Sequence, residues 1–234
     1  MTTMKKFIIN YKAYQESIDS GVRIAEAAAE IARETGVDVI IAPPFTLVRE
    51  ISKVVRTITQ GVDDIEPGAF TAHVSWYEAK KGGAVGTLLN HSEERYADAN
   101  NNLTYEALGR VVGLCKQNGL ETYVCVQNVY EAQKVLEFEP TAIAYEPPEL
   151  IGGDVSVSTA KPEVVKGFCD LVWHSSGTLP LIGAGIKTGS DVENSVALGS
   201  AGILVASGIV KSADPETAMR ELVKPLSEND AVQT

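Results

Sequence analysis

Three residues with chemically useful side chains, Lys12, His91 and Glu146, each follow the end of a short apolar run. Lysine is usually a solvated surface residue, so a polar loop is the alternative for Lys12. At the carboxyl end of a strand, however, its ammonium group can hold a phosphate or an enediolate oxygen. Glu146 ends an apolar run, where a merely solvated carboxylate is not expected. The spacing therefore predicts an active site built from strand ends.

His91 lies in a segment that reads as the start of a helix, with Asn90 as its cap and Glu93 three residues after that cap. In the first helical turn, the positive end of the helix dipole disfavours an imidazolium. We therefore expect a neutral His91 that donates a hydrogen bond to a carbonyl oxygen. A plain helix start is the alternative, and the two are compatible. His73 and His174 lack such a setting, and we expect them to be structural or surface residues.

The segment from Tyr145 to Gly153 reads Tyr-Glu-Pro-Pro-Glu-Leu-Ile-Gly-Gly. Its two prolines restrict the backbone at the near end, and its two glycines free the backbone at the far end. Stiff and pliable ends around an apolar tip are typical of a lid that moves as a unit. The alternative is a surface turn in which Glu146 caps the strand.

Glycine-rich turns follow the last two apolar runs, at 183–189 and 205–208, and each precedes a helical pattern. Backbone N–H groups in such turns can bind an anion, assisted by the positive end of the following helix. Barrels of alternating strands and helices frequently bind phosphate at these two places. By themselves the turns indicate a phosphate-binding barrel and no particular substrate.

The elements that must position these residues alternate along the whole chain. Helical patterns separate short apolar runs rich in Val and Ile, as expected of buried parallel strands. Eight such runs predict an α/β protein with a closed (β/α)8 barrel, and a doubly wound open sheet is the alternative. The predicted strands are Phe7–Asn10, Val37–Ala42, Thr57–Val62, Ala84–Leu89, Thr122–Val126, Ala142–Tyr145, Leu179–Gly183 and Ile203–Ala206.

Helical signals lie between these runs. Apolar residues from Ile18 to Ala32 recur at steps of three and four, and Gly36 ends that helix. Gly119 ends another helix, and Pro162 opens a third at its first turn. Two more helices are predicted at Thr188–Leu198 and Pro215–Val223.

The composition argues against several other classes of protein. The chain has 234 residues, 44% of them hydrophobic and 22% charged, which fits a single barrel domain over residues 1–234. A net charge of −11 without a run of Lys or Arg argues against a nucleic-acid partner. Three cysteines without a CxxC pair argue against a disulfide framework or a zinc site, and fit a reducing compartment. Without a signal peptide or a long apolar run, we expect a cytoplasmic protein with no membrane partner.

Taken in order, the motifs resemble those of triosephosphate isomerase, in the shorter form found in archaea. They are Asn-x-Lys at 10–12, His-Ser-Glu at 91–93, Tyr-Glu-Pro-Pro-Glu-Leu-Ile-Gly at 145–152, Gly-Ala-Gly-Ile at 183–186 and Ala-Ser-Gly-Ile at 206–209. The likeness extends over nearly the whole chain. It implies a TIM barrel that interconverts dihydroxyacetone phosphate and D-glyceraldehyde 3-phosphate in glycolysis and gluconeogenesis, without a metal or organic cofactor. The family is a standard example of a Glu base, a neutral His electrophile and a loop that excludes water.

The resemblance also implies roles for individual residues. Glu146 matches the base, His91 the electrophile, and Lys12 the cation that stabilises the enediolate. Glu93 matches a residue that supports the histidine. The residues that match the family's substrate-binding positions are Asn10, Lys12, Ile151, Gly152, Gly185, Ala206 and Ser207.

One departure from the family pattern lies at the far end of the lid. Many members carry Gly-Thr-Gly there, whereas this chain has Gly152, Gly153 and Asp154. The displaced glycine and the added carboxylate leave the rate of lid movement open. We expect Asp154 to point outward, because its charge would otherwise repel a phosphate.

Two other functions compete with the isomerase. A metal-dependent sugar-phosphate epimerase on the same fold would need several His and Asp ligands at strand ends. The chain has three His, of which only His91 is placed for chemistry. A non-catalytic barrel that serves as a scaffold would be favoured by loss of Glu146, His91 or Lys12, and all three are present.

We expect the chain to form a homo-oligomer, either a dimer or a tetramer. The segment Glu66–Ala72 is long for a connection between a strand and a helix, and it carries Phe70 near its tip. An exposed aromatic residue on a long loop is typical of an interface; the alternative is that Phe70 packs on its own barrel. The resemblance implies that this loop inserts beside the neighbouring subunit's active site, where Thr71 helps to fix the segment that carries Asn10 and Lys12.

Overall fold

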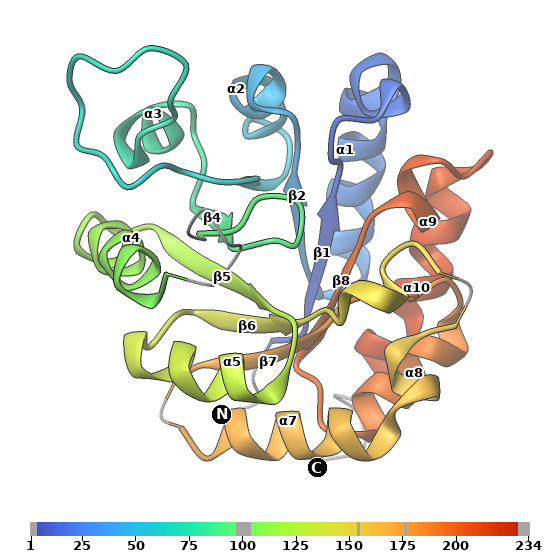
Figure 1. The fold of residues 1–234 in the computed structure, drawn as a ribbon. Coiled ribbons are helices and arrows are strands. Elements are labelled where there is room, and N and C mark those ends of the chain that lie inside the picture. Colours follow the sequence, from blue (N-terminus) through green and yellow to red (C-terminus); the bar gives the residue numbers. More distant parts are fainter. Residues whose placement is uncertain (1–3, 97–103, 154, 176, 229–234) are drawn as a thin grey trace.

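Parallel strands close into a barrel in the computed structural model, which describes residues 4–96, 104–153, 155–175 and 177–228 (Figure 1). Within this part of the chain there are eight strands, each paired with the next, and β8 pairs with β1 to close the ring. This confirms the (β/α)8 prediction and excludes the doubly wound open sheet. The strands are β1 Lys6–Asn10, β2 Asp38–Ala42, β3 Arg56–Thr59, β4 Gly86–Leu89, β5 Glu121–Val126, β6 Ala142–Tyr145, β7 Leu179–Ile182 and β8 Gly202–Val205.

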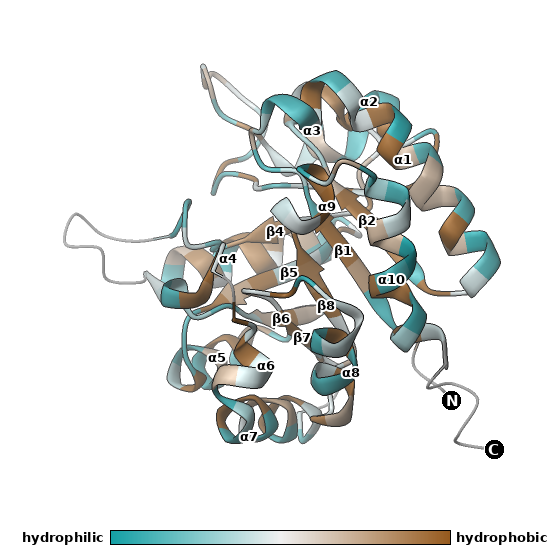
Figure 2. Cartoon of the chain, turned by 90° about the vertical axis from the view of Figure 1, so that its right-hand side faces the viewer, coloured by the Kyte–Doolittle hydropathy of each residue, from teal (hydrophilic) through white to brown (hydrophobic). Residues whose placement is uncertain are grey.

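Helices follow the strands and surround the barrel, with hydrophilic residues on their outer faces (Figure 2). The predicted ends at Gly36 and Gly119 are confirmed, because both residues adopt a positive φ directly after a helix or its cap. The α-helices are α1 Gln15–Thr35, α2 Val48–Ile51, α3 Trp76–Lys81, α4 Tyr105–Gln117, α5 Val129–Val135, α6 Val157–Ala160, α7 Pro162–Trp173, α8 Gly189–Ala197, α9 Ser207–Val210 and α10 Pro215–Glu228. The 3₁₀ helices are η1 Phe45–Leu47, η2 Leu136–Phe138 and η3 Pro148–Leu150.

Two apolar layers hold the barrel together, because side chains alternate between the two faces of each strand. Ile8 lies opposite Ile40 and Leu204 in register, and all three belong to the smaller cluster, which fills the barrel. Phe7 and Ile9, its neighbours on β1, belong to the larger cluster between strands and helices. Buried apolar residues on both faces explain why the strands read as short continuous apolar runs.

The amino ends of the strands are closed by ion pairs. Lys6 Nζ lies 2.7 Å from a carboxylate oxygen of Asp38, and Arg56 pairs with both Asp38 and Glu121. Tyr123 donates a hydrogen bond to Glu121 over 2.6 Å. This polar network occupies one end of the barrel, so the opposite end, where the carboxyl ends of the strands meet, is the one open to a ligand.

One predicted helix start is wrong. Residues 91–96 after β4 form a turn, and α4 begins only at Tyr105. Asn90 adopts a positive φ of 59°, which is incompatible with the helix cap that we expected. Its side chain instead donates to the carbonyl of Cys125 over 2.9 Å and accepts from the backbone of Tyr96. The short polar side chain that made Asn90 look like a cap therefore stabilises a left-handed turn.

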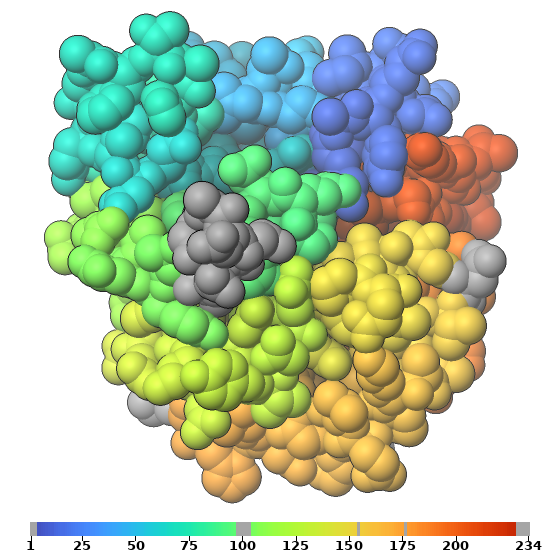
Figure 3. Space-filling view, in the orientation of Figure 1, coloured from blue at the N-terminus to red at the C-terminus, as the bar shows by residue number. Residues whose placement is uncertain are grey.

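The loop between β3 and α3 stands away from the barrel, at the upper left of Figure 1, and forms a projecting lobe in Figure 3. Phe70 is 52% exposed there, and its ring meets His73 edge-on at 5.9 Å. Within the chain, then, Phe70 does not pack on its own barrel, which was the alternative to an interface role. Thr71 is exposed beside it.

Candidate active site

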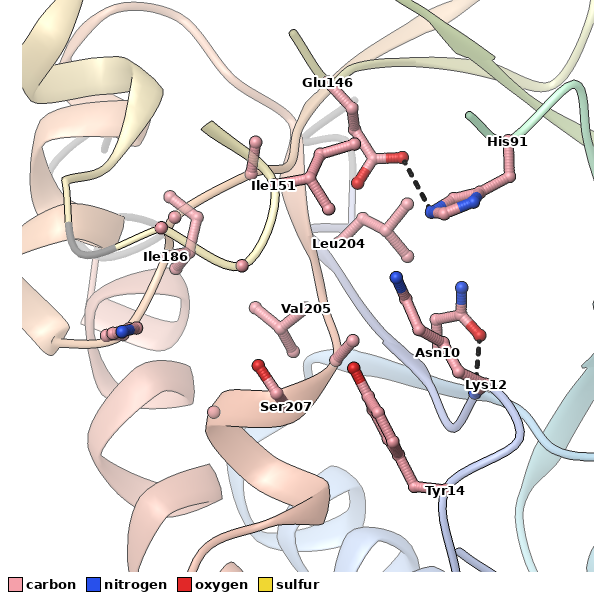
Figure 4. Close-up of a pocket in the computed structure, with 17 residues that line it drawn as sticks. Asn10, Lys12, Tyr14, His91, Glu146, Ile151, Ile186, Leu204, Val205 and Ser207 are labelled. Atoms are coloured by element: carbon pink, nitrogen blue, oxygen red, sulfur yellow. Dashed lines mark hydrogen bonds and ion pairs between the residues drawn. The ribbon is translucent and has the colours of Figure 1, made fainter. Parts of the chain in front are cut away.

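A cavity at the carboxyl ends of the strands brings together residues from five of them (Figure 4). It holds about 550 Å³ of space between its lining atoms, part of it open to solvent. His91 and Glu146 face each other across it, with Asn10 and Lys12 beside them and Ser207 at the other end. Of the residues matched to the family's catalytic and substrate-binding positions, the cavity is lined by Asn10, Lys12, His91, Glu146, Ile151, Gly152, Gly185, Ala206 and Ser207.

Glu146 and His91 are the central pair. Their side chains are each 8% exposed, and Nε2 of His91 lies 3.8 Å from Oε2 of Glu146. That separation is too long for a hydrogen bond. Oε2 of Glu146 is buried and has no hydrogen-bond partner among the described residues. A buried carboxylate oxygen without a partner is a proton acceptor held ready for a group that enters the cavity.

The environment of Glu146 raises its pKa. Burial is the largest cause, because it disfavours the charged form. His91, a hydrogen bond from Cys125 and the charge of Lys12 oppose this effect and offset it in part. A raised pKa makes Glu146 a stronger base than an exposed carboxylate, which favours removal of a proton from carbon.

Two neighbours of Glu146 have roles that the sequence did not indicate, although Gly183 belongs to a predicted anion-binding turn. Cys125 on β5 is buried and shares a hydrogen bond with the carboxylate of Glu146. Burial, the largest cause, and the carboxylate of Glu146 both raise the pKa of the Cys125 thiol, so the thiol stays protonated and can donate. Gly183 after β7 provides the space: a Cβ built there would lie 2.6 Å from both Cγ and Oε1 of Glu146. Their roles depend on strand neighbours far away in the sequence.

The turn after β4 sets the tautomer of His91. The backbone N–H of Glu93 donates to Nδ1 of His91 over 3.2 Å, so the neutral ring carries its proton on Nε2, facing Glu146. The carboxylate of Glu93 also lies 3.5 Å from Nδ1, which would favour a proton there. The N–H contact decides, because it is a hydrogen bond, whereas the Glu93 side chain is 61% exposed and water competes for it. A local turn, and not the first turn of a helix, therefore positions the ring of His91.

Lys12 is held in a strained backbone conformation. Its φ is 49°, a region that non-glycine residues rarely adopt and that clusters at functional sites. Asn10 accepts from its backbone N–H over 2.9 Å, and Gln60 donates to its carbonyl over 3.0 Å. Its ammonium lies 2.8 Å from the carboxylate of Glu93. Glu93 therefore contacts both Lys12 and His91, whereas the resemblance implied support of the histidine alone.

The far end of the cavity is made of small residues and backbone. Gly152, Gly185 and Gly208 line it, together with Ala206 and Ser207. Gly185 has a φ of 71°, and a Cβ there would lie 2.2 Å from the carbonyl oxygen of Val155, so only glycine fits. Close approach of uncharged backbone is suited to an anion bound by N–H groups. Asp154, the departure from the family pattern, lies outside the described residues.

Within the described residues, no group of three or more His, Cys, Asp or Glu side chains is arranged to hold a metal ion. Over the same part of the chain, no helix combines the length and apolar character that a membrane span requires.

Comparisons with known proteins agree with the motifs. A sequence model of the family described as triosephosphate isomerase matches residues 5–225. Named relatives include the triosephosphate isomerase of Methanopyrus kandleri, which is 42% identical over 97% of this chain and 100% of its own length. The triosephosphate isomerase of Methanocaldococcus jannaschii is 41% identical over 93% of this chain and 98% of its own length.

The fold also matches a solved structure. The crystal structure of triosephosphate isomerase from Bartonella henselae superimposes with a TM-score of 0.69 and covers 92% of this chain and 98% of that one. At 20% sequence identity, this likeness supports the barrel alone.

Proposed function

Because the chain belongs to the triosephosphate isomerase family and is an isomerase of triose phosphates, we propose that Glu146, His91 and Lys12 carry out the proton transfer of that reaction. The observation that carries this proposal is the buried Glu146 carboxylate oxygen, without a partner and 3.8 Å from Nε2 of His91. Base and electrophile face each other across a single cavity, so both can reach one bound substrate.

In the proposed reaction, Glu146 removes a proton from the carbon beside the carbonyl of dihydroxyacetone phosphate. Negative charge develops on the carbonyl oxygen, where the Nε2–H of His91 and the ammonium of Lys12 stabilise it. The protonated Glu146 then returns the proton to the neighbouring carbon, and D-glyceraldehyde 3-phosphate results. One carboxyl group serves both proton transfers at carbon. The hydroxyl proton must also pass from the first oxygen of the enediolate to the former carbonyl oxygen, and the Nε2–H group of His91 is placed to exchange it, so the proton balance closes.

We also propose that residues 147–153 form a lid over the substrate. The three-residue helix η3 is its tip, and Ile151 and Gly152 already line the cavity. The phosphate would be bound by these residues together with Gly185, Ala206 and Ser207. Closure would exclude water, strengthen the interactions with the enediolate and hinder loss of phosphate from the intermediate.

Assembly with a second copy is part of the same proposal. The exposed Phe70 and Thr71 support an interface role for the projecting loop. A hollow beside the active site, lined by Lys12, Phe45 and Gln60 among others, is a suitable receptor for that loop. The dimer would therefore complete the wall next to Lys12. Three buried free cysteines are compatible with the cytoplasm as the place of action.

A coupled assay that follows each triose phosphate tests the function. We expect isomerisation in both directions at a rate unchanged by excess chelator. A rate that falls with chelator and returns with a divalent metal would instead support the epimerase class. Purified, folded protein without isomerisation would support the scaffold.

A further inference from the structure

Two side-chain hydroxyl groups line the cavity, those of Tyr14 and Ser207, and the residue matches to the family leave Tyr14 without a role. Tyr14 immediately precedes α1, where its side chain makes no capping hydrogen bond. In Figure 4 its ring rises from the segment after Lys12, and its hydroxyl points into the end of the cavity where Ser207 lies. The neighbouring Tyr11 differs, because its hydroxyl is bound to the carbonyl of Gly21 over 2.9 Å.

The ring of Tyr14 is held by a cation. Nζ of Lys211 lies 4.3 Å from the ring centroid, a close cation–π contact. Lys211 directly follows α9, and α9 begins with Ser207. The contact therefore joins the loop after β1 to the segment after β8, and these two segments carry the two hydroxyl groups of the cavity.

The charge of this corner matters because the chain carries a net charge of −11. At the other end of the cavity the ammonium of Lys12 is paired with Glu93 over 2.8 Å. A doubly charged phosphate at the Ser207 end needs partners besides the backbone N–H groups and Lys187, which also line the cavity. The ammonium of Lys211, behind the Tyr14 ring, adds positive charge near that end, and a phenolic O–H is a donor suited to a phosphate oxygen.

We propose that Tyr14 binds the substrate's phosphate through its hydroxyl, and that Lys211 positions the Tyr14 ring for this contact. The inference rests on the proposed function and deepens it. Tyr14 gives the enzyme a side-chain contact that a triose without phosphate cannot use. It therefore contributes to selection of phosphorylated over unphosphorylated three-carbon sugars.

The test compares Tyr14→Phe and Lys211→Met with wild type. Phenylalanine keeps the ring and its contact with Lys211 and removes only the hydroxyl. We measure kcat/KM for D-glyceraldehyde 3-phosphate and for unphosphorylated D-glyceraldehyde, and the inhibition constant of inorganic phosphate. Tyr130→Phe on α5 and Lys166→Met on α7 are matched controls, because Tyr130 is 64% exposed and Lys166 pairs with Asp170 on the surface.

For Tyr14→Phe we expect kcat/KM for the phosphorylated substrate to fall about tenfold, the lower end for loss of a hydrogen bond to a charged group. The inhibition constant of phosphate should rise by a similar factor, and the rate with D-glyceraldehyde should stay the same. Lys211→Met should show the same pattern at about two- to fivefold, as expected of an exposed cation–π contact. The control variants should match wild type in all three measurements.

Three outcomes would overturn the proposal: no change with the phosphorylated substrate, an equal loss with both substrates, or an unchanged inhibition constant for phosphate. An equal loss would mean that Tyr14 supports the fold or the proton transfer instead. If wild type does not isomerise triose phosphates, the proposed function fails independently. Direct titration of wild type and Tyr14→Phe with inorganic phosphate then decides whether Tyr14 binds phosphate.

Discussion

Replacing Gly183 with alanine would place a methyl group against the base. A Cβ at this position lies 2.6 Å from both Cγ and Oε1 of Glu146 and 2.8 Å from its Cδ. Gly183 is buried and is not among the residues with a positive φ, so its backbone accepts alanine without strain. Space for Glu146 is thus the reason for glycine here, and the substitution tests whether the carboxylate must stay where the structure has it.

The size of the displacement follows from the contact distance. Ordinary van der Waals contact of a Cβ begins at 3.4 Å, so the carboxylate must retreat by about 0.8 Å. The clashing atoms belong to a side chain, which can rotate while the strands remain in place. A displacement near 1 Å costs about 10²-fold in rate when it misaligns a catalytic group. We also expect the free energy of unfolding to fall by about 1–3 kcal/mol, as is usual for an overfilled interior.

Steady-state kinetics in both directions and urea denaturation would measure these effects in Gly183→Ala. We expect a kcat about 10²-fold lower, with KM near that of wild type, because the phosphate end of the cavity is untouched. Gly167→Ala on α7 is the control: nothing lies within 4 Å of its added Cβ. That variant should keep full activity and gain about 0.5–1 kcal/mol from better helix propensity.

A kcat for Gly183→Ala within threefold of wild type would refute the reasoning, provided that the protein is folded. It would mean that the catalytic position of Glu146 differs from the one described. If Gly183→Ala loses both its activity and its cooperative unfolding transition, the kinetics do not report on the position of Glu146. In that case the steric argument expects Gly183→Ser, which adds one more atom at the same place, to be unfolded as well. A folded, active serine variant would contradict the steric argument.

Three further substitutions test the other parts of the site. Glu146→Gln should lower kcat by about 10²-fold or more. Because burial raises the pKa of Glu146, ionisation of this carboxyl group lowers the stability of wild type as the pH rises above the ordinary value of 4.5. The stability difference in urea between the variant and wild type should therefore grow in favour of the variant from pH 4 to pH 7, and a constant difference would argue against a raised pKa. Lys12→Met should lower kcat/KM by about 10- to 100-fold, the range for a hydrogen bond from a charged group, and unchanged kinetic constants would make Lys12 a surface residue. Thr71→Arg should yield a smaller species by light scattering together with a large loss of activity. Thr71 is exposed within the chain, and an interface formed there would bury the unpaired charge of the arginine, which is strongly unfavourable. A fully active monomer would contradict the interface.

The order of the elements could be predicted from the sequence. Buried parallel strands are apolar on both faces, so each of the eight appears as a short apolar run between helical patterns, and each prediction lies within three residues of the observed strand ends. The polar residues after those runs could be assigned to one end of the barrel, because parallel strands direct their carboxyl ends the same way. That reasoning located Glu146, His91 and Lys12, and the motif order connected them to a family.

Contacts between strands required the tertiary structure. Cys125 and Gln60 carry no local signal for a role at the site, and the glycine-rich turn at Gly183 predicted anion binding and not space for Glu146. They matter because closure of the barrel brings β5, β7 and the end of β3 beside Glu146 and Lys12. The distance between Gly183 and Glu146 depends on how β6 and β7 pair, and no residue pattern within either strand encodes it.

The turn that carries His91 shows where local patterns fail. Asn90 and Glu93 fit a helix cap by residue type, yet the side chain of Asn90 bonds to the carbonyl of Cys125 on the next strand. That contact between distant residues favours a left-handed turn over a helix start, because it satisfies a buried polar group. The sequence by itself therefore determined which residues reach the site. Only the tertiary structure decided the geometry in which they meet, since that geometry depends on hydrogen bonds and space shared between separate strands.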